Sequence, residues 1–364
     1  MDRRAFLGAT AGALALPGCT ARTRPSVAAA SPVQCLPRVV ADKSRLIRAV
    51  AGLRPYRASG FVVRREALGD KALVHNYGHG GAGITLSWGT SRLAADLGLP
   101  GHTGPVGVIG AGIMGLTTAR LVQEAGFPVT IYTEKLPPDT TSNIAGGQWS
   151  PFGHYREQAV TPQWRAQFAA ALDYSWRRFQ IMVGEDYGVR WLPTYIEDDG
   201  PDPSSPLERY HPAGRKLTRA EHPFPLQRLA RFDTMYVETG RFLRELAQDV
   251  QIAGGRIAVR RFNAPAELAA LPERLIFNCT GLGSHALFGD AELVPVRGQL
   301  AILLPQPEVR YAFTGQAGYM FPRPDGILLG GTFERGEWRA EPHAADIDRI
   351  IASHSRLFGG WRCA

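Results

Sequence analysis

The stretch VGVIGAGIMG, residues 106–115, decides the fold, because an apolar run leads directly into three glycines spaced Gly-x-Gly-x-x-Gly. A helical pattern of apolar residues follows and ends at Gly126. In such a strand–turn–helix unit, Gly110 makes the tight turn, Gly112 lets the backbone approach a pyrophosphate, and Gly115 lets the helix pack on the strand. The stretch therefore predicts a Rossmann-type α/β fold that binds a dinucleotide at the N-terminus of the helix.

A second apolar strand pattern, residues 129–132, lies downstream and leads to Glu134 and Lys135. Glu134 follows Gly110 by 24 positions, close to the spacing at which an acidic residue accepts hydrogen bonds from the ribose of a dinucleotide. The pattern supports dinucleotide binding but does not distinguish NAD from FAD.

Composition narrows the classes of protein that remain possible. The chain has 364 residues, 45% hydrophobic and 20% charged, which is typical of a soluble globular protein with one large or two ordinary domains. The net charge of +8 comes mostly from scattered arginines, without a block of like charges. This pattern favours anionic ligands mildly and argues against nucleic acid as a partner.

The first nineteen residues form a separate segment. They contain Arg3-Arg4, then small apolar residues, and end in Leu-Pro-Gly-Cys at 16–19, which resembles a twin-arginine export signal with a lipoprotein cleavage box. The apolar part is shorter than the 20 or so residues that span a membrane. We therefore expect an exported protein, periplasmic or tethered to the membrane through a lipidated Cys19, with residues 20–39 as the tether.

Further stretches identify the kind of dinucleotide. The loop TTSNIAGGQW (140–149) follows the second strand, and IFNCTGLG (276–283) and PVRGQ (295–299) come later. The most specific stretch is LVHNYGHGGAGITLSWG (73–89), which is preceded by Gly-Leu-Arg-Pro at 52–55. Together they resemble motifs of the D-amino-acid oxidase family of FAD-dependent oxidoreductases. The resemblance implies FAD as the cofactor.

The order of these motifs differs from the order in the family. The motifs found here at 52–55 and 73–89 close the chain in the family, whereas here they precede the dinucleotide glycines. The sequence thus resembles a circular permutant, in which residues of about 40–97 have moved ahead of the first dinucleotide strand. The turn-rich stretch GLPGHTGP (98–105) would be the joint. Such a rearrangement is tolerated where the native termini lie close together.

The resemblance also implies three residues at the substrate. Arg54 would bind the substrate carboxylate, because a planar guanidinium can pair with it through two hydrogen bonds; a surface ion pair is the alternative. Tyr319 matches a family tyrosine that bonds the same carboxylate, with packing in the core as the alternative. Gly81 lies in a glycine-rich turn whose backbone N–H groups would favour negative charge on the flavin. Residues 315–317, Gly-Gln-Ala, replace a tyrosine common in the family, which leaves substrate scope open.

The dinucleotide motif and the resemblance together assign a set of residues to FAD binding. They are Gly80, Gly81, Gly83, Ile84, Thr85, Gly110, Gly112, Ile113, Met114, Gly115, Glu134, Lys135, Thr140, Thr141, Ser142, Gly146, Gly147, Gln148, Phe262, Thr280 and Gly281.

Histidines and cysteines complete the candidate residues. His75 and His79 have no Cys or acidic partner at zinc spacing, so we interpret them as structural hydrogen-bonding groups and predict no metal. If the permutation is real, Cys35 and Cys363 lie on either side of the opened loop. In an oxidising compartment they would form a disulfide, with two free thiols as the alternative.

We therefore expect an FAD-binding Rossmann-type domain interleaved with an α+β substrate domain that contains a mixed or antiparallel sheet. The expected activity is FAD-dependent oxidation of a small amino acid, in the first place a D-amino acid, to the imino acid or 2-oxo acid with ammonia and hydrogen peroxide. The alternatives are a dehydrogenase passing electrons to a quinone, a glycine or N-methyl amino-acid oxidase, and a non-catalytic flavin-binding lipoprotein. The expected domain boundaries are 40–97, 105–152, 232–292 and 336–364 for FAD binding, and 153–231 and 293–335 for the substrate.

Overall fold

The computed structural model describes residues 35–202 and 204–363. The predicted export signal, the lipidation site at Cys19 and most of the tether lie outside the described residues. No helix in the described part of the chain has the length and apolar character that a membrane span requires.

The dinucleotide motif lies in a six-stranded sheet, sheet B, whose strands run parallel except for β2 at one edge. Parallel sheets are normally covered on both faces, and the strand side chains here alternate between two apolar clusters. The strand order is β2 (Val62–Leu68), β3 (Lys71–Tyr77), β10 (Leu275–Asn278), β4 (Val106–Ile109), β5 (Val129–Thr133) and β9 (Arg256–Val259).

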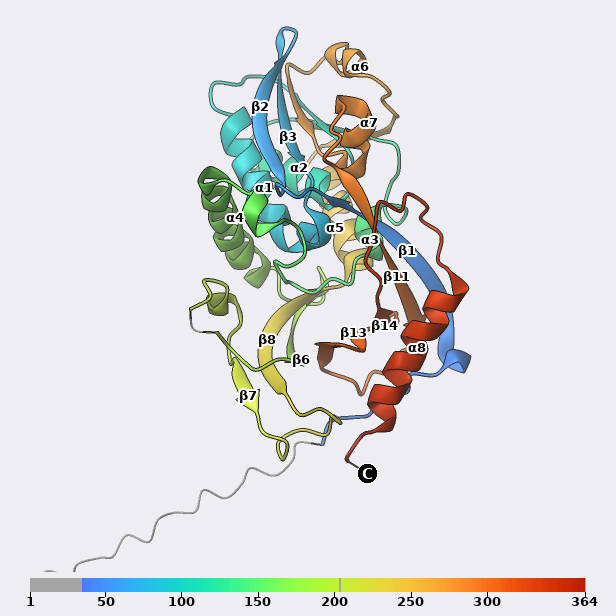
Figure 1. Cartoon of the computed structure of the whole chain (residues 1–364). Coiled ribbons are helices and arrows are strands. Elements are labelled where there is room, and N and C mark those ends of the chain that lie inside the picture. The colour runs from blue at the N-terminus through green and yellow to red at the C-terminus, as the bar shows by residue number, and fades with distance from the viewer. Residues whose placement is uncertain (1–34, 203, 364) are drawn as a thin grey trace, which may run out of the picture. The chain divides into compact units, whose positions relative to one another are not determined.

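Helices cover both faces of sheet B (Figure 1). On one face, α1 packs against α4 and α2, and α2 packs against α5. The start of α4 follows from its sequence, because the side chain of Thr161 caps the backbone N–H of Trp164 and Pro162 occupies the first turn. The helices of this face are α1 (Gly83–Gly98), α2 (Ile113–Glu124), α4 (Pro162–Gln180) and α5 (Thr239–Ile252), and those of the other are α6 (Pro265–Ala269) and α7 (Ser284–Phe288).

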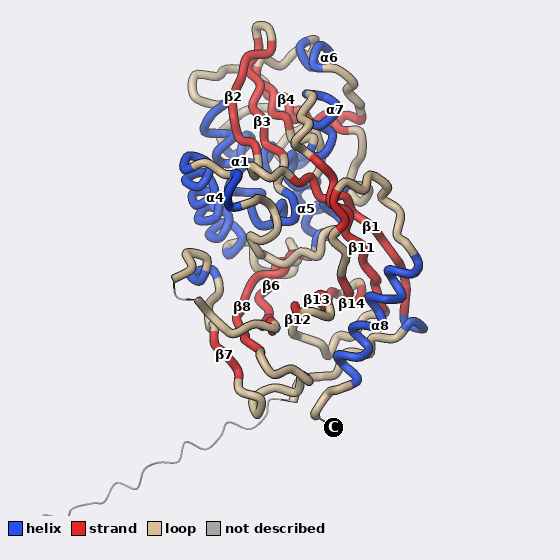
Figure 2. The backbone as a smooth tube through the Cα atoms, viewed as in Figure 1, coloured by secondary structure: helices blue, strands red, loops and turns tan. Residues whose placement is uncertain are grey.

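The second sheet, sheet A, is mixed, because β12 pairs with β6 in parallel and its other pairs are antiparallel. Its long strands β1 and β11 run side by side (Figure 2). Its order is β1 (Leu46–Tyr56), β11 (Val294–Leu303), β14 (Gly326–Gly330), β13 (Gly318–Arg323), β12 (Ala312–Gly315), β6 (Val189–Ile196), β8 (Leu229–Val237) and β7 (Arg215–Leu217), with β15 (Glu334–Arg335) also paired to β11.

The structure divides the chain differently from the boundaries expected from the sequence. β1 was expected in the FAD part, but pairs with β11 along its whole length in sheet A. The helix α8 (Ala344–Gly359), expected in the same part, packs against β11, β13 and β14 of sheet A. Conversely, α4 was expected in the substrate part and packs on α1 beside sheet B. In each case the side chains buried by the contact, and not the position in sequence, decide the placement.

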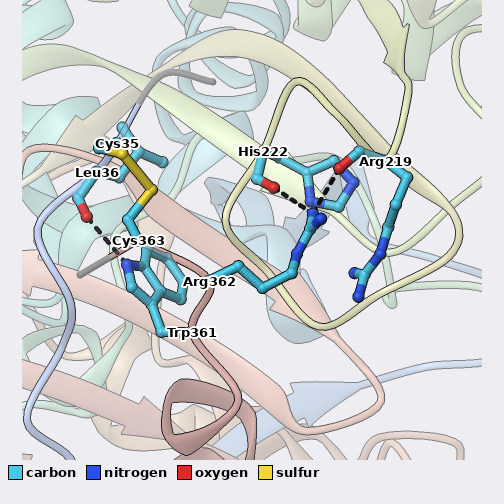
Figure 3. Close-up of a disulfide and its surroundings, with 7 residues drawn as sticks. All are labelled: Cys35, Leu36, Arg219, His222, Trp361, Arg362 and Cys363. Carbon is cyan, nitrogen blue, oxygen red and sulfur yellow. Dashed lines mark hydrogen bonds between the residues drawn. A yellow bond between two sulfur atoms is a disulfide. The ribbon is translucent and has the colours of Figure 1, made fainter. Parts of the chain in front are cut away.

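A disulfide joins Cys35 and Cys363, with a Cα–Cα distance of 5.7 Å (Figure 3). This confirms the predicted pairing. The neighbouring Trp361 donates its indole N–H to the carbonyl of Leu36 at 3.1 Å, so the first and last described segments are also joined by a hydrogen bond. The segment around the disulfide therefore links the two ends of the described chain.

Candidate active site

A cavity of about 800 Å³ extends from the dinucleotide motif to the strands β1, β11 and β13 of sheet A. All the residues predicted for the cofactor and the substrate line it, except Thr85 and Gly115. Thr85 is buried, and its hydroxyl donates to the carbonyl of Ser150 at 2.9 Å. Gly115 lies in α2, where it packs against the backbone of Gly110 in the glycine turn. The sequence motifs of both chain halves therefore meet in one cavity.

The glycines of the dinucleotide motif have the backbone requirements that the sequence implied. Gly110 has a φ of 107°, a conformation that favours glycine. A Cβ on Gly115 would lie 1.8 Å from the carbonyl oxygen of Gly110. Gly112 is the N-cap of α2, where free N–H groups and the helix dipole favour a phosphate. The N–H of Ile113 already donates to Ser142 Oγ at 3.0 Å, which joins the loop at 140–149 to this turn.

Charged side chains gather at the far end of the cavity, beyond β5 and β9. Glu134 lies there beside Arg261, with 3.6 Å between Oε1 and Nη1. The guanidinium of Arg260 lies 4.6 Å from the ring centre of Phe262. This end offers a carboxylate for ribose hydroxyls and an aromatic face for a base.

The glycine-rich turn from the early motif lies against the cavity as well. Gly80–Ala82 form a short 3₁₀ turn that leads into α1, and Gly83 and Ile84 at its N-terminus line the cavity. A Cβ on Gly80 would lie 2.9 Å from the Cα of His154, and Gly80 has a φ of 52°. Only glycine fits there without strain, so the backbone is left bare where it faces the cavity.

Arg54 reaches from β1 to this glycine turn. A Cβ on Gly81 would lie 3.8 Å from Arg54 Cδ. The guanidinium donates to the carbonyl of Thr332 at 3.3 Å and lies 5.9 Å from the ring centre of Phe333. Arg54 has no ion-pair partner among residues 35–202 and 204–363. A guanidinium without a carboxylate partner, facing a cavity, is suited to bind an anionic ligand.

Tyr319 of β13 lies beside Arg54. Burial raises the pKa of its phenol, although the neighbouring Arg54 guanidinium opposes the rise. The hydroxyl therefore keeps its proton at neutral pH and can donate a hydrogen bond to the same anion as Arg54. The aromatic ring lies close to Gly330, where a Cβ would come within 2.1 Å of the tyrosine Cζ.

The two histidines of the early motif are hydrogen-bonded within the protein. His75 Nε2 lies 2.9 Å from Glu66 Oε1, and its Nδ1 lies 2.9 Å from the side-chain amide of Asn278. His79 Nε2 lies 2.9 Å from Thr90 Oγ1. Burial, together with the charge of His154, lowers the pKa of His79 to about 3. His79 is therefore neutral in the physiological range and carries no charge into the cavity.

The substrate end also includes residues to which the sequence motifs assign no role. Gly52 and Gly298 lie in the motif stretches 52–55 and 295–299, but their place in the wall follows from strand pairing, which sets them opposite each other; Thr332 and Phe333 follow β14. Phe152 is also in the wall and is 59% exposed. The signal that could have found the group is the pairing of the Gly-Leu-Arg-Pro strand with the Pro-Val-Arg-Gly-Gln strand. The residues missed at this end are Gly52, Leu53, Ile144, Phe152, Gly298, Leu300, Thr314, Phe321, Gly331, Thr332 and Phe333.

Fold and cavity together are those of a dinucleotide-binding enzyme with an anion site. The model of the family described as FAD dependent oxidoreductase, DAO, matches residues 1–97 and 105–361. The chain belongs to this family of FAD-dependent oxidoreductases, and its cofactor is FAD.

Two curated relatives illustrate the similarity. The chain is 31% identical over 273 residues to a D-amino-acid oxidase of Streptomyces coelicolor, covering 70% of this chain and 79% of the relative. It is also 31% identical over 258 residues to a D-aspartate oxidase of Homo sapiens, covering 69% of this chain and 74% of the relative.

Among solved structures, glycine oxidase from Geobacillus kaustophilus matches with a TM-score of 0.53 at 15% identity, over 71% of this chain and 80% of that chain. At this identity the similarity concerns the fold, which combines a parallel Rossmann-like sheet with a mixed sheet as described above.

The cavity fits FAD. The bare turn at Gly110–Gly112 and the N-terminus of α2 provide donors for the pyrophosphate, and Glu134 provides a carboxylate for the ribose. The glycine turn before α1 leaves the backbone accessible where the cavity approaches Arg54. A second helix N-terminus at that point favours negative charge, as the sequence motif implied.

Proposed function

We propose that the protein oxidises a D-amino acid with a neutral side chain to the corresponding imino acid, which hydrolyses to the 2-oxo acid and ammonia. The observation that carries the proposal is the guanidinium of Arg54, which has no ion-pair partner among the described residues and lies beside Tyr319 in the cavity of the dinucleotide motif. The D configuration is supported by the two curated relatives, which are named for D-amino acids and D-aspartate.

The residues of this chain would bind and orient the substrate. Arg54 would pair with the carboxylate through two hydrogen bonds, and the protonated hydroxyl of Tyr319 would donate a third. These contacts fix the position and the plane of the carboxylate, and this limits where the attached Cα and its hydrogen can lie in the cavity. FAD, when bound, accepts the two electrons and the hydrogen that leave the Cα.

The distribution of charge in the cavity supports a neutral side chain. Apart from Arg54, the charged residues of the wall all follow β5 or β9 at the adenosine end, namely Glu134, Lys135, Asp139, Arg260 and Arg261. Around Arg54 the wall has no second charged side chain, and it includes the apolar Phe152 and Phe333, which are 59% and 56% exposed. An acidic side chain would be desolvated there without a second cation to pair with. The apolar residues of this part of the wall include Leu53, Phe152, Phe321 and Phe333.

The first experiment is anaerobic reduction of the purified FAD-loaded protein by single amino acids, followed by loss of flavin absorbance. We expect D-phenylalanine, D-methionine or D-alanine to bleach the flavin at least about tenfold faster than D-aspartate, because an unpaired buried carboxylate costs more than 1 kcal/mol. L-amino acids serve as the stereochemical control. In air, the yield of peroxide per turnover distinguishes oxygen from another electron acceptor.

The outcomes separate the parts of the proposal. FAD that remains oxidised with every D- and L-amino acid would contradict the activity and indicate a flavin-binding protein without turnover. Fastest reduction by D-aspartate would contradict the neutral side chain alone. Fastest reduction by glycine or an N-methyl amino acid would replace the D-amino acid as the substrate class.

We also propose that the chain is a circular permutant within its family. The family model matches in two segments, 1–97 and 105–361, and the residues between them form the exposed loop that joins α1 to β4. The proposal is supported by the order of sheet B. There β3, which precedes the dinucleotide glycines in the sequence, lies between β2 and β10, and β10 follows those glycines. It is also supported by the closeness of Cys35 and Cys363, which the disulfide holds together.

The permutation can be tested with a rearranged chain, in which the dinucleotide motif comes first and the motifs at 52–55 and 73–89 come last. A chain that begins at residue 105, runs to 363, continues through one to three added residues into 35 and ends at 97 should fold, because a Cα–Cα gap of 5.7 Å is within two peptide spacings. Both cysteines are replaced by serine in this chain, and the same replacements in the natural order are the control. We expect the rearranged chain to bind FAD and to retain turnover. An insoluble or flavin-free product, beside a folded control, would contradict the proposal.

A further inference from the structure

A buried polar network lies directly behind the substrate anchor, and Gln299 of β11 is at its centre. Gln299 is 0% exposed. Its side-chain amide donates to Glu334 Oε1 at 2.7 Å and to Asp346 Oδ2 at 2.8 Å, and its carbonyl oxygen accepts from the backbone N–H of His343 at 2.5 Å. Both N–H groups and the oxygen of the amide are therefore engaged, and they connect β11 to the start of α8.

The same network reaches Thr332. The backbone N–H of Gln299 donates to Thr332 Oγ1 at 3.1 Å, and that hydroxyl donates to Glu334 Oε1 at 2.5 Å. Thr332 is thus fixed through its hydroxyl, while its carbonyl oxygen accepts from Arg54 Nη1 at 3.3 Å. The side-chain amide of Gln299 is therefore connected to the guanidinium of Arg54 through Glu334 and Thr332.

The carboxylate that completes the network is itself fixed. Arg297 donates from Nε to Glu334 Oε2 at 3.0 Å. Burial favours the protonated form of Glu334, but the hydrogen bonds from Arg297, Thr332 and Gln299 hold its pKa below the usual value. Glu334 is therefore a carboxylate at neutral pH and accepts all three donors.

The guanidinium has little freedom on its other side. A Cβ on Gly298 would lie 2.3 Å from Arg54 Nη2, so the plane of the guanidinium passes close to the backbone of β11. Gly298 precedes Gln299, and Thr332 is bonded to Gln299. Two of the contacts of Arg54 therefore adjoin Gln299: Gly298 precedes it in β11, and the Thr332 hydroxyl shares Glu334 Oε1 with its side-chain amide. Pairing of a guanidinium with a carboxylate through two parallel hydrogen bonds requires that orientation.

We propose that Gln299 is a positioning residue for the substrate carboxylate, because it holds Thr332, whose carbonyl oxygen orients the guanidinium of Arg54. This inference rests on the proposed function, since it assumes a carboxylate substrate at Arg54. Gln299 touches neither substrate nor cofactor in this role. Its side-chain amide holds Glu334, Glu334 accepts from the Thr332 hydroxyl, and the Thr332 carbonyl accepts from Arg54.

Two variants test the path at different points. Gln299→Leu removes the amide, and Thr332→Val removes only the hydroxyl while preserving the shape of the side chain and the carbonyl. In both, we expect the KM for the best D-amino acid and the Kd for propionate, measured by its perturbation of the oxidised flavin spectrum, to rise about tenfold, the size expected for one lost or misaligned hydrogen bond. The limiting rate of anaerobic flavin reduction should change less than about twofold, because the path does not contact the Cα.

The chain offers a matched control and a rescue. Gln306 is 4% exposed, and its side chain bonds both backbone groups of Val40, without contact to Arg54 or Thr332. Gln306→Leu therefore removes a buried amide of the same kind and should leave KM and the Kd for propionate unchanged. Thr332→Ser restores the hydroxyl and should return both constants to within about twofold of the wild type, since the hydrogen bonds are re-formed.

The results distinguish the inference from the function on which it rests. If the wild type turns over a D-amino acid while Thr332→Val and Gln299→Leu keep its KM, the positioning role is wrong and the proposed function stands. An equal rise of KM in Gln306→Leu would equally refute the role, because it would show a general effect of losing a buried amide. If Gln299→Leu does not fold, Gln299→Asn takes its place, because the shorter side chain keeps a buried amide but withdraws it from Glu334, and both constants should rise in the same way. A wild type that turns over no amino acid contradicts the proposed function itself.

Discussion

Replacing Arg54 by Ala should raise the KM for a D-amino acid by about 10²- to 10⁴-fold, because two charge-assisted hydrogen bonds of about 1.5–3 kcal/mol each are lost. The FAD contacts are elsewhere in the cavity, so the variant should remain yellow and fold normally. Arg54→Lys should recover only part of the loss, since an ammonium keeps the charge but not the planar pair of donors. The measurements are steady-state kinetics and the Kd for propionate.

The control lies on the same strand. Arg48 is exposed on β1 and has no place in the cavity wall, so Arg48→Ala should leave both constants unchanged. Unaltered kinetics in Arg54→Ala would show that the substrate carboxylate binds elsewhere. The proposed function would then lose its main support, although FAD binding would not be affected.

Gly115→Ala should produce a protein without bound FAD. The added Cβ would lie 1.8 Å from the carbonyl oxygen of Gly110, and that atom belongs to the backbone of the tight turn, which cannot rotate away. Either α2 must move from β4 or the turn must open, and both displace the donors for the pyrophosphate. Overpacking of this kind costs roughly 1–3 kcal/mol of unfolding free energy. The flavin absorbance of the purified protein and its denaturant midpoint measure the two effects.

Gly240 provides the matched comparison, because it is also a glycine in the first turn of a helix. A Cβ there would meet no atom within 4 Å. Gly240→Ala should be neutral or slightly stabilising, by up to about 1 kcal/mol from helix propensity. Full FAD occupancy in Gly115→Ala would mean that the helix and the turn tolerate separation, and that this glycine is not required by the cofactor.

The cofactor end of the site was predictable from the sequence because its requirements are local. Gly110, Gly112 and Glu134 follow one another through a strand, a turn and a helix, and each has a conformational or chemical reason that is visible in the sequence. The predicted disulfide was found as well. Arg54 and Tyr319 were placed together through resemblance to a family, and the structure brings both to the same cavity.

The remaining part of the site depends on pairing between distant segments. β1 contributes Arg54, but whether its strand joins sheet A or sheet B depends on the side chains of β11, about 240 positions away, and sequence periodicity carries no such information. The helix α8 has an apolar face that could cover either sheet. Thr332 belongs to no motif, and its importance follows only from the direction of its carbonyl toward Arg54.

The disulfide between Cys35 and Cys363 also determines what a proteolytic cut would do to this molecule. Most residues between α1 and β4 are exposed, and cleavage there would release neither piece, because the sulfur–sulfur bond would still connect them. The cut would create one new end after the helix α1 and one before the nucleotide-binding strand β4. Cleavage at one surface loop would thus leave two segments that stay covalently joined at the disulfide and not at the loop.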